Sequence, residues 1–347
     1  MSVDSRPALV GSKRMRSLVG WLVIASLCAS LACRREVSPP VTAEPARPSP
    51  PPAPVFVEAA TPPCIARTSP GAALLVPDAA QWLFVTDTQA LAASPTWQFF
   101  ATKLAREPNW QFAEGVFESC NMTMLGFDRL VVGVDPETED FVAILAGQRI
   151  GEPERAQCLI TAIQRANGDE VAAEVSRMKG EIGLPIIQFT DGRAYLFADD
   201  MLALSTTGWE DEVARLSRCE GVGAVQRGLA DPLRHVSQDA PLWLVGRPRL
   251  VAESAIVSMS PRLLGLRTLA LELTFADGLA LVAHADLGER AQALALFDEL
   301  TGTVQSFASA DAAWAAMMKR VQMSVEGTSL TLGASLSLDE LRALQPD

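Results

Sequence analysis

Histidine, lysine and tyrosine are scarce in this sequence of 347 residues, which contains two histidines, four lysines and one tyrosine. A serine or cysteine nucleophile usually needs a histidine within reach as its base. His284 falls in a predicted strand and His235 at the end of a predicted amphipathic helix, and neither lies near a nucleophile-elbow motif. This pattern argues against a hydrolytic triad.

Motifs for cofactors and metals are missing as well. The glycines of residues 221–228 miss the dinucleotide fingerprint, because the third comes two residues late and no strand precedes them. Ser176 and Lys179 have the Ser-x-x-Lys spacing of penicillin-binding enzymes, but the companion Ser-Asp-Asn and Lys-Thr-Gly motifs are absent from the sequence. The acidic stretch Asp135–Asp140 lacks the glycine and the ligand spacing of a calcium loop, and the cysteines are too widely spaced for a typical zinc site. We therefore expect neither a cofactor nor a bound metal.

The chain is acidic, with 41 acidic residues against 29 basic ones and a net charge of −12. Residues 1–32 contain four basic residues and one acidic residue, so the remainder carries a charge of −15. An acidic surface repels phosphate backbones and anionic lipid headgroups. Nucleic acid is therefore disfavoured as a partner, and attachment to a membrane would need a covalent or inserted anchor.

The amino terminus has the pattern of an export signal. Three basic residues, Lys13, Arg14 and Arg16, precede the apolar run Leu18–Ala32, which is too short to span a bilayer but has the length of a signal-peptide core. The segment Ser30-Leu31-Ala32-Cys33 resembles the lipobox of bacterial lipoproteins, although Ser30 stands where leucine is most typical. The resemblance implies that Cys33 is lipidated and becomes the new amino terminus, which would place the folded body outside the cytoplasm in the cell envelope.

Several points about this terminus stay open. Translation could begin at Met1 or at Met15, and the membrane could be the inner or the outer one. An ordinary signal peptide cut near Ala29 and an uncleaved anchor helix are the alternatives to lipidation. Residues 33–63 are rich in proline and alanine, with the core Pro48–Pro52, and are expected to form a disordered tether. In a polyproline-like conformation this tether would reach about 90 Å from the bilayer.

Four cysteines remain after residues 1–32 are removed and Cys33 is lipidated. An even number in an oxidising compartment suggests two disulfides. Of the three possible pairings we favour Cys120 with Cys158 and Cys64 with Cys219. The first would link a helix end to the next helix across a hairpin, and four buried thiols are the alternative.

Periodicity from Ala79 onward predicts an α+β protein, with antiparallel sheets on which helices pack. The first half is predicted to contain a strand, two helices, a hairpin, a helix, a second hairpin and a helix, at residues 81–86, 95–106, 109–124, 129–147, 152–167, 185–205 and 209–218. Ser94 and Pro95 are typical of a helix start, and Asp191-Gly192 is typical of a hairpin turn.

The second half repeats this order. It is predicted to contain a strand at 241–246, a helical stretch, a hairpin at 266–285, a helix at 289–307, a helical piece, a hairpin at 321–337 and a helix at 338–344. We therefore expect an internal duplication with two similar units, residues 64–220 and 221–347, each of the form strand-helix-hairpin-helix-hairpin-helix. Chance alternation of strands and helices stays open as the alternative.

The element order, the paired Trp82 and Trp243 and the placement of the cysteines resemble uncharacterised exported bacterial proteins that are grouped only as families of unknown function. The resemblance covers most of residues 64–344. It implies a similar fold and carries no information about chemistry.

Three functions follow as hypotheses. The first is a lipid-anchored, non-enzymatic envelope protein that binds a protein, lipid or glycan partner. The second is a periplasmic carrier or chaperone for apolar ligands. The third is an enzyme that uses carboxylates such as Asp199 and Asp200, which predicts a polar cleft with acid groups of shifted pKa. The tryptophans are expected to pack in the core rather than to form a sugar-binding platform, and the oligomeric state is left open.

Overall fold

The fold is described from a computed structural model of the full chain. The structure describes residues 72–166, 174–177, 184–189, 192–249, 260–310, 315 and 318–343. All of them belong to one compact unit, Thr61–Asp347. Residues 1–71, which include Cys33 and Cys64, lie outside the described residues.

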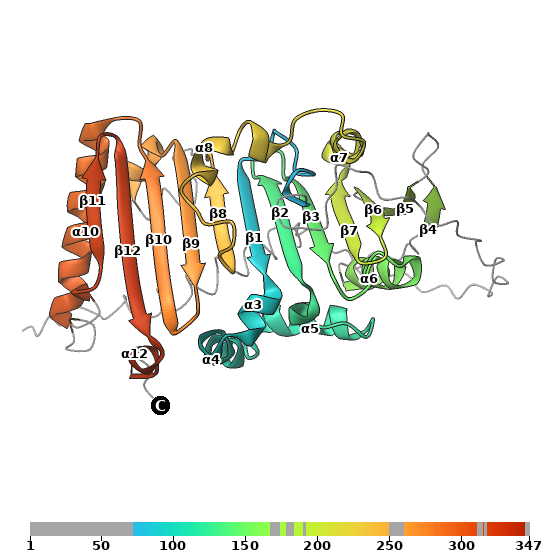
Figure 1. The fold of residues 1–347 in the computed structure, drawn as a ribbon, viewed down its shortest axis with the longest axis horizontal. Helices are drawn as coiled ribbons and strands as arrows, with labels where there is room; N and C mark the ends of the chain where they lie inside the picture. The colour runs from blue at the N-terminus through green and yellow to red at the C-terminus, as the bar shows by residue number, and fades with distance from the viewer. Residues whose placement is uncertain are drawn as a thin grey trace, which may run out of the picture. The chain divides into compact units, whose positions relative to one another are not determined.

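The described strands form one antiparallel sheet of twelve strands, in the order β11-β12-β10-β9-β8-β1-β2-β3-β7-β6-β5-β4 (Figure 1). Their bounds are β1 Trp82–Asp87, β2 Arg129–Asp135, β3 Asp140–Ala146, β4 Glu174–Arg177, β5 Pro185–Phe189, β6 Gly192–Ala198, β7 Met201–Thr206, β8 Leu242–Gly246, β9 Thr268–Thr274, β10 Gly278–Asp286, β11 Gln322–Glu326 and β12 Ser329–Ser337. With the helices packed on it, this sheet makes the protein α+β, as predicted.

The helices connect and cover these strands. The α-helices are α3 Thr88–Ala93, α4 Pro95–Leu104, α5 Pro108–Glu118, α6 Pro153–Ala166, α7 Glu210–Ser217, α8 Ala230–Leu233, α10 Arg290–Ala310 and α12 Leu338–Ala343. Short 3-10 turns are η1 Met124–Gly126, η2 Thr207–Trp209, η3 Ala224–Gln226 and η4 Pro261–Gly265. Among the described residues, no helix is both long and apolar enough to cross a bilayer.

The middle of the sheet is the antiparallel pair β1 and β8, which are far apart in sequence. Phe84 lies opposite Leu244, and Trp82 lies opposite Gly246. A side chain at position 246 would collide with the Trp82 ring, so glycine allows this close approach. The predicted boundary between residues 220 and 221 therefore falls inside one compact unit, whose two halves share a sheet.

The main hydrophobic core lies on one face of the sheet, between the strands and a cover made by residues 72–80, η2, α7, η3 and the segment through α8. Buried members on the strands are Leu83, Val85, Val131, Val142, Ile144, Tyr195, Phe197, Ala203, Trp243, Val245 and Ala270. Buried members from the cover are Leu75, Val76, Ala80, Trp209, Val213, Leu216, Ala224 and Leu229. We call this side the core face.

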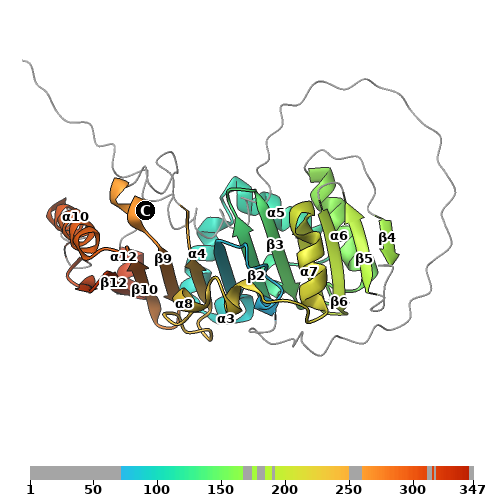
Figure 2. The ribbon, with the colours of Figure 1, turned by 90° about the horizontal axis from the view of Figure 1, so that it is seen from above.

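A second, smaller cluster lies on the opposite face, at the carboxyl-terminal end of the sheet. Ala270 of the core face pairs with His284, which pairs with Thr331, so the neighbouring Leu330 points the other way. Leu330 packs with Leu287 and with α10 residues Ala293 and Leu296. Figure 2, which views the molecule from above, shows α10 at this end of the sheet.

Local signals predicted several elements well. Ser94 Oγ accepts a hydrogen bond from the Trp97 amide at 3.2 Å, as expected for a residue that caps α4. The helix predicted over residues 109–124 ends earlier, at Glu118, because the chain turns through Asn121, whose φ is 55°. Residues 185–205 were predicted to form one hairpin of two strands, and this prediction is wrong. The segment forms three strands, β5, β6 and β7, and β6 turns into β7 at Asp199 and Asp200.

The predicted disulfide between Cys120 and Cys158 is present, with a Cα–Cα distance of 5.8 Å. It joins the turn after α5 to the middle of α6, across the β2–β3 hairpin. Cys219 is also disulfide-bonded, and its predicted partner, Cys64, lies outside the described residues.

Candidate functional site

The two histidines of the chain lie side by side, which their positions in sequence did not indicate. His235 follows α8, His284 lies in β10, and their ring centroids are 5.0 Å apart with the rings tilted by 30°. Thr331 of β12 lies 3.1 Å from Nδ1 of His284. On the next strand, the Glu272 carboxylate accepts a hydrogen bond from the amide of Ser237 at 2.7 Å, which holds the His235 segment against the sheet.

Burial lowers the pKa of His284, and the neighbouring His235 adds to this effect, while Glu272 opposes it. The His284 ring is therefore neutral at pH 7 and can accept or donate a hydrogen bond. The described groups nearby supply one hydroxyl, Thr331, and one carboxylate, Glu272, which is already engaged by a backbone amide. Within the described ranges, no three His, Cys, Asp or Glu side chains are arranged to hold a metal ion.

This shift gives a pH-dependence of stability with a definite sign. The folded chain protonates His284 less readily than the unfolded chain, whose histidine has the ordinary pKa of about 6.5. Stability from this residue is therefore complete above about pH 6.5 and is lost as the pH falls through the lowered pKa of His284. We expect His284→Gln to flatten the fall in free energy of unfolding between about pH 6.5 and 4.5, as measured by urea unfolding.

His235→Gln is the matched control for this prediction. It removes the neighbouring positive charge but leaves His284 buried, so the pKa of His284 in an NMR titration should rise only part of the way to its ordinary value. A wild-type His284 that titrates at or above 6.5 would contradict the prediction.

A polar cleft of about 650 Å³ lies where strands β2 and β3 meet in their turn, and it is bordered by the start of α7 and by residues 221–227. Its carboxylates include Asp78, Asp135 and Asp140. Each of them is bonded within the protein: Asp135 accepts from Gln81 at 2.8 Å, Asp140 accepts from Thr206 at 2.8 Å, and Asp78 accepts from the backbone of residue 228 at 2.9 Å. These bonds fix the turn and the strand ends, so the acidic turn has a structural role.

Among the described residues, the two carboxyl groups with a displaced pKa are Glu220 and Glu340, and in both the pKa is lowered, the opposite of what a general acid needs. Arg218 beside Glu220 lowers the pKa of that carboxyl, and the Ser337 amide and hydroxyl lower the pKa of Glu340. Both side chains are therefore held as carboxylates. Asp199 and Asp200, the pair considered for catalysis, form the β6–β7 turn, where their backbone carbonyls accept from Gly151 and Gly147 at 3.0 and 2.7 Å.

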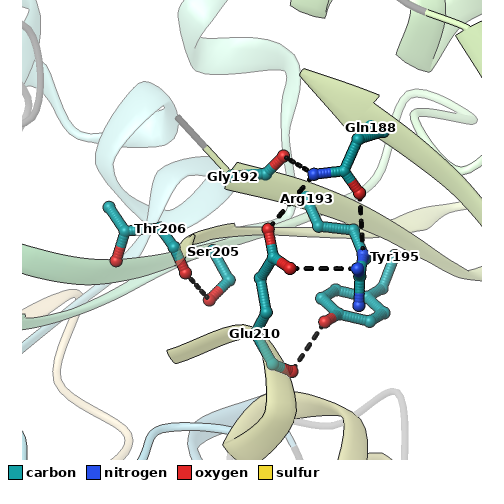
Figure 3. A network of polar contacts seen from close by, with 7 residues as sticks. All are labelled: Gln188, Gly192, Arg193, Tyr195, Ser205, Thr206 and Glu210. Atoms are coloured by element: carbon teal, nitrogen blue, oxygen red, sulfur yellow. Dashed lines mark hydrogen bonds and ion pairs between the residues drawn. The ribbon is translucent and has the colours of Figure 1, made fainter. Parts of the chain in front are cut away.

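A polar network of the buried Glu210, the half-buried Arg193 and the exposed Gln188 anchors α7 to the sheet (Figure 3). Arg193 of β6 forms an ion pair with Glu210 at 3.0 Å, and Gln188 of β5 contacts both side chains, at 3.0 Å to Arg193 and 3.3 Å to Glu210. The Tyr195 hydroxyl donates to the Glu210 carbonyl at 2.7 Å. Burial raises the pKa of Tyr195, so its hydroxyl keeps the proton that it donates.

The face opposite the core face carries leucines that are only half-buried in β9, β10 and β12. We call it the leucine face and define it by Leu269, Leu271, Leu273, Leu279, Leu281, Leu332 and Leu336. On the same face of the other half, the residues that pair across β2 and β3 are more buried, with Leu130 at 9% and Leu145 at 6% exposure. Each of these seven leucines is thus only partly covered in the structure, whereas their counterparts in the other half are buried.

The remaining predicted residues have structural positions. Trp97, Trp110, Trp209 and Trp243 are at most 5% exposed, so they pack in the core as expected. Gly223 lies beside Pro77, and a side chain at this glycine would meet the Leu74 carbonyl at 2.6 Å, which accounts for a glycine without any phosphate. Ser176 lies in strand β4, and Lys179 lies outside the described residues.

Comparisons with known proteins give limited information. No protein-family model matches the sequence, and no curated protein matches it. Crystal form III of TP0453 is similar in structure, with a TM-score of 0.47, 8% identity and coverage of 79% of this chain and 96% of that chain. Crystal form IV gives 0.45, 9%, 79% and 95%, and crystal form I gives 0.46, 9%, 78% and 95%. Similarity at this level assigns neither a family nor a function.

Proposed function

We propose that this protein is a lipid-anchored, extracytoplasmic binding protein that uses the leucine face to hold an apolar segment of a protein partner. The observation that carries the binding role is the half-buried leucine face of β9, β10 and β12. The proposal of an anchor rests on the sequence before and after Cys33: an apolar signal core ending in Ser-Leu-Ala, and a proline-rich tether. Lipidation would hold the acidic body near a membrane that does not attract its charge.

We infer further that the two halves of the sheet arose by duplication. Outward from the centre, one half has β1, β2, β3, β7 and β6, and the other has β8, β9, β10, β12 and β11. In each half a strand leads to a hairpin, then a helix, then a further hairpin pair. Among the described strands of the second half, β5 and β4 have no counterpart, so the described part of this half is the shorter version of the same unit.

Under this duplication, the leucine face is the less covered of two equivalent surfaces, one in each half of the sheet. In the first half, Leu130, Val132 and Leu145 are at most 9% exposed, and α3, α5 and α6 belong to this half. In the second half, the described cluster around α10 is limited to the outer strands. Covering a half-buried leucine side chain contributes about 1 to 2 kcal/mol, so several together are enough for a specific partner.

A carrier of acyl chains is a second candidate, favoured by the composition of this face. The strand residues that point to it are Leu and Ala, which offer no hydrogen bond, and an acyl chain needs none. The carboxylate-enzyme hypothesis gains nothing from Asp199 and Asp200, whose backbone carbonyls shape a turn.

The test extracts the full chain from its native membranes in mild detergent and analyses the sample by mass spectrometry. We expect a diacylated Cys33 peptide and a protein bound in defined stoichiometry, which Leu281→Ser should weaken by about tenfold or more, because the contact loses one buried leucine. Val282→Ser is the matched control, since this 38% exposed neighbour lies on the opposite face of β10.

Each outcome has one interpretation. Stoichiometric lipid in place of protein, lost in L281S and kept in V282S, would support the carrier instead. An unmodified Cys33 would overturn the anchor, and equal binding by L281S and V282S would overturn the leucine face as the site.

A further inference from the structure

Among the strands that the structure describes, β11 forms one edge of the sheet and pairs only with β12. The side chains of Gln322, Ser324 and Glu326 on it are exposed, while Met323 and Val325 are half-buried. Edge strands expose backbone groups that can pair with another chain, and proteins usually protect them with proline, lysine or a bulge. β11 has none of these three features.

The other half of the sheet shows what can occupy this position. Its strand β6, the counterpart of β11 under the duplication inferred above, continues into β5 and β4. Helix α6 packs on those two additional strands, whereas α10, its counterpart, packs on β11 and β12. The position beyond β11 is therefore one where this fold can accept a further strand beside a helix.

The backbone of β11 has a defined phase for such pairing. The β11–β12 hairpin turns through the two residues Gly327 and Thr328, and a two-residue loop is closed by a hydrogen-bonded pair, here Glu326 with Ser329. Because such pairs alternate along an antiparallel ladder, Ser324 also directs its backbone to β12. Met323 and Val325 then direct their N–H and C=O groups away from the sheet.

Helix α10 extends this edge with an apolar side chain. Ala293 and Leu296 face the sheet, and Glu299 forms an ion pair with Arg262 of η4 at 2.9 Å, on the side toward β9. At about 100° per residue, Leu294 lies on the opposite flank of the helix. Its exposure is 43%, so α10, which packs on β11 and β12, presents an uncovered apolar side chain to solvent.

We propose that the chain forms a two-fold dimer in which the β11 strands of two copies pair antiparallel, centred on Ser324. In this register Met323 of each copy pairs with Val325 of the other through their outward backbone groups. Gln322 lies opposite Glu326, so no two like charges meet, and Ser324 meets its own copy. Because the two-fold axis is perpendicular to the sheet, the two α10 helices lie on the same face of the joined sheet.

A second copy is a better occupant than residues 39–54 of the tether, where at most four residues separate successive prolines and each proline has no N–H to donate to a ladder. The dimer rests on the inferred duplication and on the edge itself, and does not require the leucine face to bind a partner. The two proposals can therefore fail separately.

The first test uses charge at the symmetry centre, in the full chain purified in detergent. Ser324 is exposed, so Ser324→Lys and Ser324→Glu leave the packing intact. Each variant alone places two like charges opposite each other, and we expect the dissociation constant of its dimer to rise about tenfold at low salt, where the repulsion is least screened. Mixing the two variants, carrying different affinity tags, should restore a heterodimer that copurifies.

The second test measures register in membranes. Directly opposite residues of a non-hydrogen-bonded pair are close enough for a disulfide, so Ser324→Cys should give a covalent dimer on a non-reducing gel. Glu326→Cys is equally exposed, but it should run as a monomer on this gel when expressed alone. It should form a covalent dimer only when coexpressed with Gln322→Cys, because the register places residue 326 opposite residue 322. A monomeric wild type, or equal crosslinking by S324C and E326C, would overturn the proposal, and crosslinking of S324C to a different protein would assign the edge to another partner.

Discussion

Replacing both Cys120 and Cys158 with serine is expected to lower the free energy of unfolding by about 4 kcal/mol, as measured by urea denaturation. The disulfide closes a loop with a sequence separation of 38 residues, which contains the whole β2–β3 hairpin. In the chain-entropy account, removing the bond raises the conformational entropy of the unfolded chain and leaves that of the folded chain unchanged, so the folded state becomes less stable.

The control for this prediction is the denaturant slope. If the folded state is unchanged, the midpoint moves and the native signal stays the same, whereas the slope is expected to rise slightly because the unfolded chain becomes less compact. A loss below about 1 kcal/mol would mean that the ends of α5 and α6 are held together equally well without the bond between Cys120 and Cys158.

The second large effect is expected for Glu210→Ala, which should lower the free energy of unfolding by about 3 kcal/mol. The Glu210 side chain is 11% exposed and its partner Arg193 is 23% exposed. Removing the carboxylate breaks the ion pair with the Arg193 guanidinium and the hydrogen bond from the Gln188 amide, so both groups lose an acceptor in the folded state. Urea denaturation monitored by tryptophan fluorescence measures the loss, because Trp209 lies beside Glu210 in sequence.

Glu212→Ala is the matched control on the same helix. Glu212 pairs with Arg215 at 31% and 50% exposure, so its loss should cost less than about 1 kcal/mol. Arg193→Ala combined with Glu210→Ala should cost less than the sum of the two single variants, since neither charge is then left alone. Equal effects of the Glu210 and Glu212 variants would contradict the role assigned to the polar network around Glu210.

Local sequence signals predicted what local chemistry determines. Ser94 with Pro95 indicated a helix start, and the Ser94 hydroxyl does accept the Trp97 amide. The hairpins predicted at residues 266–285 and 321–337 are present, and the glycines at their turns, Gly278 and Gly327, have positive φ, at 152° and 60°. The β6–β7 turn was missed because residues 185–205 were assigned to a single hairpin around Asp191-Gly192, although aspartate is itself a common turn residue and Asp199-Asp200 forms a second turn.

Long-range pairings could not be predicted in this way. Nothing near His235 indicates that its ring meets His284, because that contact depends on how β8, β9 and β10 align after the loop that carries His235. The pairing of β1 with β8 is of the same kind, since each strand is apolar on both faces and accepts many partners. Cys120 with Cys158 was predictable because Cys120 follows one helix, Cys158 lies in the next, and a single hairpin separates the two helices.

The central position of β8 determines when the molecule can complete its fold. During synthesis or export from the amino terminus, residues 242–246 follow β1 by about 160 residues, so β1 is an unprotected edge until then. Contacts between such distant segments are slow to form. Folding is therefore expected to end with the closing of β1 on β8, and nascent chains that stop before residue 242 would keep an edge open to aggregation.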